Sequence, residues 1–195
     1  MAENKVSAYH LANNPTMFEP ARSNTFRFIV TNFDNLLRAG ADPDSATDSD
    51  YLRNAQETLE LAVVSFEPPK FSLGTIEIRR ANSVMKAAGM PTFNTGSLVV
   101  TDYVGANTKG ILAAWQGLAY NVKTDKIGYM TDYKKDCYVL EYDVNSRLIN
   151  QYLLHGCWVQ DLTPDTFDVT AGDNKRNITA VIQYDWAELL PSDVE

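Results

Sequence analysis

Alternating apolar and polar positions predict β-strands along much of the chain. The alternation is clearest in two stretches, residues 24–31 and residues 177–186. A period of two places successive side chains on opposite faces of a strand, so we expect each stretch to bury one face. The expected buried faces consist of Phe26, Phe28 and Val30 in the first stretch, and of Ile178, Ala180, Ile182, Tyr184 and Trp186 in the second.

Residues 96–120 predict a strand, a turn and a helix in succession. Residues 96–103 are rich in β-branched and aromatic side chains, which is typical of strands. A turn follows from Gly105, in which Asn107 or Thr108 can cap a helix. Apolar residues then recur at offsets of 0, 1, 4, 7 and 8, which places them on one face of a helix. These residues are Ile111, Leu112, Trp115, Leu118 and Ala119.

Other stretches predict further strands. Residues 56–66 are apolar on both faces in their second half, which favours a long strand in the centre of a sheet or at an interface. Within residues 71–80 the alternation changes phase at Gly74, which indicates a β-bulge. Strands at 137–143 and 149–161 are expected to form a hairpin across Asn145-Ser146. Short helical turns are expected at 33–38 and 81–89.

The fold class that these elements predict is mainly β. Six to eight strands with one convincing helix favour a β-sandwich or barrel with an α-helix packed on one side. At 195 residues, the chain is most simply a single domain, residues 1–195, that buries about 70% of its extended surface.

Two segments lack a sustained period. Residues 1–22 predict an N-terminal arm, which is either a frayed terminus or a segment that docks on a neighbouring surface. Residues 40–54 form a long acidic loop without the central glycine and closing glutamate of a calcium-binding EF-hand loop, so we expect a solvated or assembly-facing loop. The candidate interface residues are Tyr9, Leu11, Met17 and Phe18 in the arm and Asp42, Asp44, Asp48 and Asp50 in the loop.

Charge and hydropathy narrow the class of protein. The formal net charge is −8, whereas a general nucleic-acid binder would show a basic stripe. No apolar run approaches the roughly 20 residues of a membrane helix. Residues 1–5 lack the basic start and apolar core of a signal peptide, so we expect a protein that is made in a cytoplasm.

The sequence predicts no catalytic site, metal or cofactor. The two histidines, His10 and His155, have no ligand partner at metal-binding spacing, and we interpret His155 as a structural or interface residue. Cys137 and Cys157 form no CxxC motif, and a short hairpin loop centred on Arg147 would place them opposite each other. We predict two free thiols that act as small apolar groups.

Three pieces in a fixed order resemble a known family. They are the strand 25–30; the segment 76–80 with Gly89-Met90-Pro91, the strand from Gly96 and the helix of Trp115; and the ending 148–166 with the strand 178–186. Together they resemble the tail tube protein of contractile-tailed bacteriophages, which is similar in fold to the secreted tube protein of type VI secretion systems. The resemblance covers roughly residues 20–188 and departs from the family in the 40–54 loop and at Pro68-Pro69.

The resemblance implies a structural protein rather than an enzyme. Subunits of that family form hexameric rings, which stack into a hollow tube that is part of the virion. It implies that strands line the channel and that the helix lies outside the sheet. The implied partners are further copies of the chain, a sheath protein outside, the tape-measure protein and DNA in the lumen, and a baseplate and a tail terminator at the ends; assembly takes place in the host cytoplasm.

Two other classes remain open. One is a tube-related baseplate or tail-completion protein that stops at a single ring. The other is a small enzyme or ligand-binding barrel, which would require a concave pocket with convergent polar groups.

A channel for DNA also suggests where acidic side chains lie. Basic side chains on the wall would hold phosphate groups, whereas acidic ones repel them and keep the duplex centred. Our hypothesis is a net negative lumen to which the polar faces of long strands contribute, with Glu57, Glu60, Glu141 and Asp143 as candidates.

Overall fold

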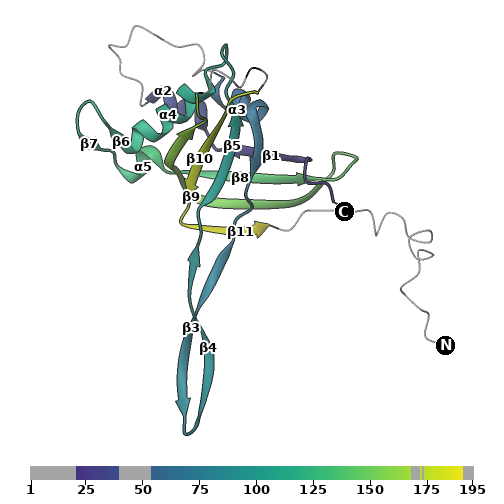
Figure 1. The fold of residues 1–195 in the computed structure, drawn as a ribbon, viewed down its shortest axis with the longest axis vertical. Helices are drawn as coiled ribbons and strands as arrows, with labels where there is room; N and C mark the ends of the chain where they lie inside the picture. The colour runs from purple at the N-terminus through teal and green to yellow at the C-terminus, as the bar shows by residue number, and fades with distance from the viewer. Residues whose placement is uncertain (1–20, 40–53, 168–171, 173, 191–195) are drawn as a thin grey trace, which may run out of the picture.

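A computed structural model describes residues 21–39, 54–167, 172 and 174–190. Figure 1 shows a body of strands and helices from which one long hairpin extends. The elements are β1 (Phe26–Val30), α2 (Phe33–Ala39), α3 (Ala55–Ala62), β2 (Val63–Phe66), β3 (Phe71–Arg80), β4 (Ser83–Phe93), β5 (Gly96–Thr101), α4 (Thr108–Ala119), β6 (Tyr120–Asn121), β7 (Lys126–Ile127), α5 (Met130–Tyr133), β8 (Lys135–Tyr142), β9 (Leu148–Pro164), β10 (Asn177–Gln183) and β11 (Trp186–Leu190).

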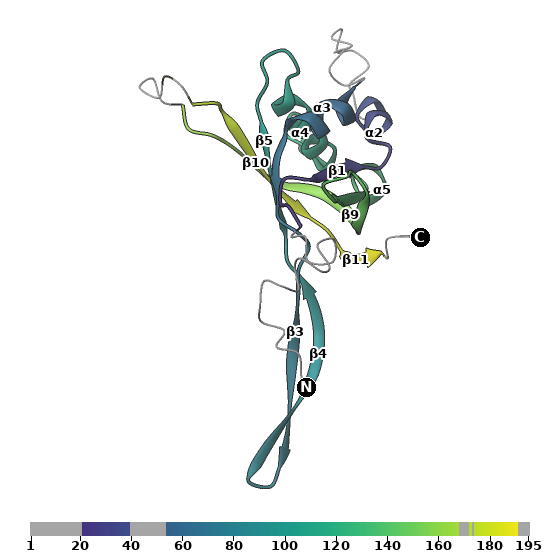
Figure 2. The same cartoon turned by 90° about the vertical axis from the view of Figure 1, so that its right-hand side faces the viewer.

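Seven strands of the described residues form one antiparallel sheet. Its order is β1-β8-β9-β10-β5-β2, and β11 pairs with β9. The sheet curls, because the rings of Phe28 in β1 and Phe66 in β2, at the two ends of this order, lie with centroids 4.9 Å apart. Figure 2 shows the helices gathered on one side of these strands. The predicted mainly β fold with helix packed on one side is therefore confirmed.

The 17-residue strand β9 joins the two halves of the curled sheet. Its first part pairs with β8 and β11, and its last part pairs with β10. Gly156 lies between these parts at a φ of +67°, in the left-handed region that glycine occupies without a Cβ penalty. A Cβ at this position would lie 2.4 Å from Asp185 Oδ2, so a larger residue would also have to displace the Asp185 carboxylate.

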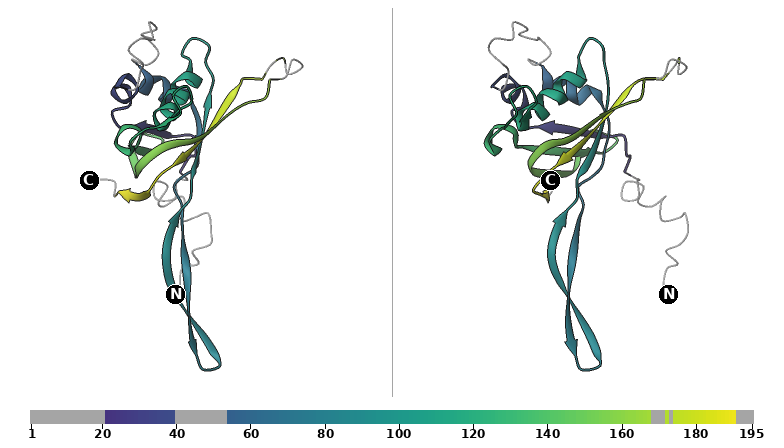
Figure 3. Two further views of the ribbon diagram at one scale, coloured as in Figure 1. Left: turned by 90° about the vertical axis from the view of Figure 1, so that its left-hand side faces the viewer. Right: turned by 60° about the vertical axis from the view of Figure 1, so that its left-hand side comes forward.

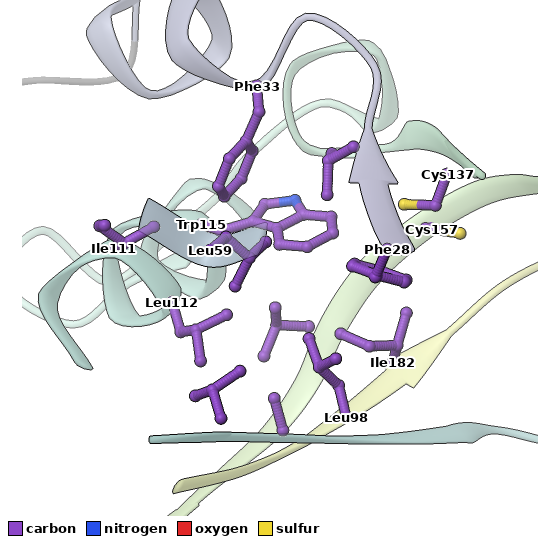
Figure 4. Packing of buried hydrophobic residues seen from close by; sticks show 14 of the residues in the cluster. Phe28, Phe33, Leu59, Leu98, Ile111, Leu112, Trp115, Cys137, Cys157 and Ile182 are labelled. Atoms are coloured by element: carbon purple, nitrogen blue, oxygen red, sulfur yellow. The ribbon is translucent and has the colours of Figure 1, made fainter. Parts of the chain in front are cut away.

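Helix α4 covers the core as its apolar period predicted. Asn107 caps it, since the Asn107 side chain accepts a hydrogen bond from the Gly110 amide. Ile111, Leu112 and Trp115 are fully buried. Figure 4 shows Trp115 beneath Phe33, whose ring meets it edge-on at 5.2 Å between centroids. The indole Nε1 of Trp115 donates to the Tyr133 carbonyl at 3.0 Å, so this large side chain is hydrogen-bonded as well as packed.

The strand predicted over residues 56–66 is wrong for most of its length. Residues 55–62 form helix α3, and only Val63–Phe66 are strand. Ala55, Leu59 and Ala62 are buried at helical spacing, while Leu61 is 74% exposed. The helix closes over the outer edge of β1, where the Gln56 side chain accepts from the Val30 amide at 3.0 Å.

Three smaller predictions also need correction. Residues 81–89 do not form a helical turn, because they contain the tip of the β3–β4 hairpin and most of β4. The strand expected to reach Trp186 ends at Gln183, and Trp186 begins β11 with half of its surface exposed. The described residues contain four helices rather than one, of which α2 confirms the turn predicted at 33–38.

Candidate assembly surfaces

The hairpin of β3 and β4 stands apart from the body. Figures 1 and 3 show it extending from the foot of the molecule, away from the helices. Every residue of β3 is exposed, and in β4 only Gly89 and Phe93 are partly covered. A two-stranded ribbon without a third strand or a helix against it is marginally stable in water. The hairpin therefore presents a surface that another chain can complete.

One face of the hairpin is apolar and the other is polar. In the strand register Ile76 faces Ala87 and Ile78 faces Met85, so these four side chains share a face. About half of the surface of Ile76, Ile78 and Met85 is exposed: 55%, 51% and 51%. The opposite face carries Glu77 paired with Lys86 and Arg79 paired with Val84. The predicted bulge at Gly74 is confirmed by a register shift between Leu73 and Thr75.

The tip of the hairpin is basic and tightly turned. Arg80 pairs with Ser83, which leaves a two-residue turn whose first residue, Ala81, has a φ of +50°. The Ser83 hydroxyl donates to the Arg80 carbonyl at 3.0 Å and braces the turn. Arg79, Arg80 and Lys86 against the single acid Glu77 give residues 71–93 a charge of +2, in a chain whose total is −8. The remainder of the chain therefore carries −10.

A groove of about 590 Å³ lies where the two ends of the curled sheet approach each other. Phe26, Val64, Phe66 and Val139 supply apolar parts of its wall, and the polar segment 22–25, which includes Arg22, also lines it. Glu141 of β8 stands in its wall, with its Oε2 held by the Asn150 side-chain amide at 2.9 Å. The groove opens beside the foot of the β3–β4 hairpin, because Pro68 also lines it and β3 begins shortly after, at Phe71.

A second hollow of about 700 Å³ lies among α2, α4, β7 and α5. Polar and apolar residues both line it, and its charged residues are Lys126 and Lys135 with a single acid, Asp132. Ile127 and Tyr129 also line it and are largely exposed, at 82% and 81%. The charged residues of this hollow leave it net positive, whereas Arg22 and Glu141 balance each other in the groove.

The structure places some candidate residues and leaves others unplaced. The arm residues Tyr9, Leu11, Met17 and Phe18 and the loop residues Asp42, Asp44, Asp48 and Asp50 lie outside the described residues, so their roles stay predictions.

Glu57 and Glu60 lie on helix α3, so they do not belong to the polar face of a strand as predicted. Glu60 forms an ion pair with Arg27 and accepts a hydrogen bond from Gln56 at 2.7 Å. Glu141 does lie on a strand, and the next candidate, Asp143, begins the turn between β8 and β9. A place in a channel wall stays a prediction for these residues.

His155 joins strands β9 and β11. Its ring stacks on Trp186 at 4.7 Å between centroids, and its Nε2 lies 3.0 Å from Glu188 Oε1. Nδ1 lies 3.5 Å from Asp136 Oδ1. These contacts are made across paired strands, which agrees with a structural histidine.

The two cysteines are free and buried, as predicted. Cys137 pairs in register with Leu154, and Cys157 pairs with Lys135, because the register shifts between them. The direct opposition that a short loop centred on Arg147 suggested is therefore wrong. Burial and the neighbouring Cys157 raise the pKa of the Cys137 thiol well above its ordinary value.

The part of the chain that the structure describes contains no candidate metal site. Within residues 21–39, 54–167, 172 and 174–190, no three side chains of His, Cys, Asp or Glu are placed to hold a metal ion. No helix in these ranges has the length and apolar character to span a membrane. The features that call for a partner are thus the exposed hairpin, the groove and the second hollow.

Comparison with solved structures shows what this fold resembles. A chain from the sheath-tube complex of PVC, an extracellular contractile injection system, matches with a TM-score of 0.62 and 13% identity, over 95% of this chain and 98% of that one. A chain from the six-fold symmetrised baseplate of the anti-feeding prophage gives 0.60 and 10%, over 90% and 99%. A chain from the PVC sheath/tube terminator gives 0.59 and 14%, over 88% and 97%.

Comparison of the sequence alone gives no further relative. No protein-family profile matches the chain, and no curated protein matches it significantly. At identities of 13%, 14% and 10% the structural similarity concerns the fold. The fold that the resemblance implied is therefore confirmed.

Proposed function

We propose that this protein is the repeating subunit of the inner tube of a contractile injection apparatus. Its copies assemble into rings, the rings stack into a hollow tube, and a sheath surrounds that tube. The fold similarity to chains of a sheath-tube complex, a terminator and a baseplate supports a place in this kind of assembly. The role is structural, and we assign no catalytic reaction to it.

The observation that carries this proposal is the β3–β4 hairpin. It holds apolar side chains such as Ile76 and Ile78 about half exposed on a ribbon that its own body does not cover. Exposed apolar patches of this kind mark sites of protein association. A subunit that repeats along a tube needs such a projecting element at every copy, because each copy must bind the next.

The finer form of the proposal is the tail tube of a contractile-tailed bacteriophage. Six subunits form each ring, and the tube belongs to the virion after assembly in the host cytoplasm. The tape-measure protein and then DNA occupy the lumen, and a baseplate and a tail terminator close the ends. A net negative lumen would let DNA pass without being held, since lysine and arginine on the wall would bind phosphate along every ring.

A single-ring end protein is the second candidate, because the similar structures include a terminator and a baseplate. The way in which assembly depends on protein concentration distinguishes the two functions. Purified tube subunit, examined by negative-stain electron microscopy over a series of concentrations, should form rings and then tubes of increasing length. An end protein stops at one ring. Monomers at every concentration would contradict both functions.

A further inference from the structure

We infer that the groove between β1 and β2 binds the basic tip of the β3–β4 hairpin from a second copy of this chain. The inference rests on the proposed function, and it assigns the acceptor surface for the contact that builds the tube. Glu141 and Asp143 then face a neighbouring subunit, in place of the open channel wall suggested by the sequence.

The groove offers apolar side chains that can cover the apolar face of a hairpin. It lies between β1 and β2, which end the order of the main sheet and do not pair with each other. Val64 of β2 is 41% exposed there, and Phe26, Phe66 and Val139 supply further apolar wall. The hairpin offers the matching apolar face of Ile76, Ile78 and Met85. Contact between them would remove apolar surface from water on both partners.

The balance of charge differs between the two hollows, because Arg22 and Glu141 offset each other in the groove, whereas Lys126 and Lys135 outnumber Asp132 in the second hollow. Arg79 and Arg80 give the hairpin tip two positive charges. Glu141 lies in the wall of the groove, and Asp143 follows it at the start of the β8–β9 turn. The second hollow instead presents Lys126 and Lys135, which would repel an arginine tip. Glutamate beside apolar side chains also suits arginine, which pairs with carboxylates through a planar fork.

The length of the hairpin lets this contact repeat. A strand of the length of β3 extends about 33 Å at about 3.3 Å per residue. The groove of the same copy lies beside the foot of the hairpin. The donor tip and the acceptor groove of one chain are therefore separated by about one hairpin length. Shifting a second copy by that length along the hairpin brings one copy's tip to the other copy's groove. A head-to-tail contact made by translation along the hairpin continues as a filament or tube, because no rotation closes it into a ring.

Charge reversal with rescue tests the pairing. One variant carries Arg79→Glu and Arg80→Glu, a second carries Glu141→Lys and Asp143→Lys, and a third carries all four changes. We expect each of the first two to raise the critical concentration for tube formation at least tenfold, and the third to recover most of that loss. Asp132→Lys, which reverses a charge in the other hollow, is the matched control and should leave the critical concentration within about twofold.

A cross-link provides a second measurement that does not depend on the charge variants. Arg80→Cys in one preparation and Asp143→Cys in another should form a disulfide-linked dimer when the two are mixed and oxidised. Neither variant alone should form it, because each lacks the partner thiol and the native cysteines are buried. Circular dichroism and melting temperature first verify that each variant is folded.

The outcomes separate the groove from the proposed function. If the arginine variant stops assembly but the fourfold variant gains nothing and no cross-link forms, the groove assignment is overturned while the tube function stands. If the wild-type protein itself never forms rings or tubes, the proposed function fails first. Rescue together with the mixed cross-link supports the groove.

Discussion

The apolar face of the hairpin allows a quantitative test of tube assembly. We consider Ile76→Thr combined with Ile78→Thr. Threonine keeps a β-branched side chain, so the strand preference of the hairpin changes little. What changes is the apolar surface available to a neighbouring subunit. The free subunit should fold and melt as before, because half-exposed side chains away from a core contribute within about 0.5 kcal/mol to its stability.

The expected loss of binding follows from the exposed fractions. Complete burial of an isoleucine side chain contributes about 1.5–3 kcal/mol. Ile76 and Ile78 are 55% and 51% exposed, so docking can gain only about half of that from each. The double variant should therefore lose about 2 kcal/mol per contact. Since about 1.4 kcal/mol is a factor of ten, each contact weakens roughly 30-fold, and the critical concentration for tubes should rise by a similar factor.

The assay is sedimentation of tubes over a dilution series, with electron microscopy of the pellets. Val84→Thr is the matched control, because Val84 is similarly exposed, at 52%, but lies on the opposite face of the hairpin. It should shift the critical concentration by less than Ile78→Thr alone. An unchanged critical concentration in the double variant, or equal effects of the two single changes, would show that the apolar face does not bind a neighbour.

Three further changes test the fold. Ala81 has a φ of +50°. Ala81→Gly should therefore stabilise the hairpin turn by about 1 kcal/mol, and slower amide hydrogen exchange in β3 and β4 would reveal it. Trp115→Phe leaves the Tyr133 carbonyl without its donor and should lower the free energy of unfolding by about 2–3 kcal/mol, measured in urea. Because the pKa of Cys137 is raised in the folded chain, the unfolded chain releases this proton first as the pH rises above the ordinary thiol range. Stability should therefore fall with rising pH, and Cys137→Ala should reduce that slope by up to about 1.4 kcal/mol per pH unit in urea titrations.

The central sheet and α4 could be predicted from sequence because their periods are unambiguous. Ile178, Ala180 and Ile182 alternate over a full strand, and all three are buried in β10. Asn107 and Trp115 mark the start and the buried face of α4 as predicted. In these elements the local preference and the tertiary environment agree, which is the condition under which a sequence pattern identifies its element.

Helix α3 shows where the pattern becomes ambiguous. Leu59 belongs both to an alternating set with Leu61 and to a helical set with Ala55 and Ala62. The strand-forming Val63-Val64 that follows favoured the strand interpretation. Glutamine, glutamate, leucine and alanine in residues 55–62 are good helix formers, and this preference was the available signal for a helix. A contact from another part of the chain also stabilises the start of this helix, since the Gln56 backbone amide donates to Asp34 Oδ1 at 3.0 Å.

The hairpin shows a different limit of sequence information. Alternation in residues 71–80 predicts an apolar face, but the same alternation results whether that face packs on its own body or on another chain. The turn was also obscured, because Ala81 takes a left-handed conformation in which glycine, asparagine or aspartate is the usual residue. Only the structure separates the ribbon from the body and shows that its apolar face is exposed.

An exposed ribbon must also avoid irregular aggregation, and the charged residues of the hairpin can help it to do so. Both strands have one unpaired edge, and unprotected edges with apolar side chains promote irregular aggregation. Glu77, Arg79 and Lys86 occupy the face opposite the isoleucines, and Arg80 lies at the tip. A misaligned pair of hairpins would bring these arginines close together and bury charge without a partner. In the contact proposed above, the same arginines lie near Glu141 and Asp143 instead, so the charges of the hairpin would oppose disordered association and favour the ordered one.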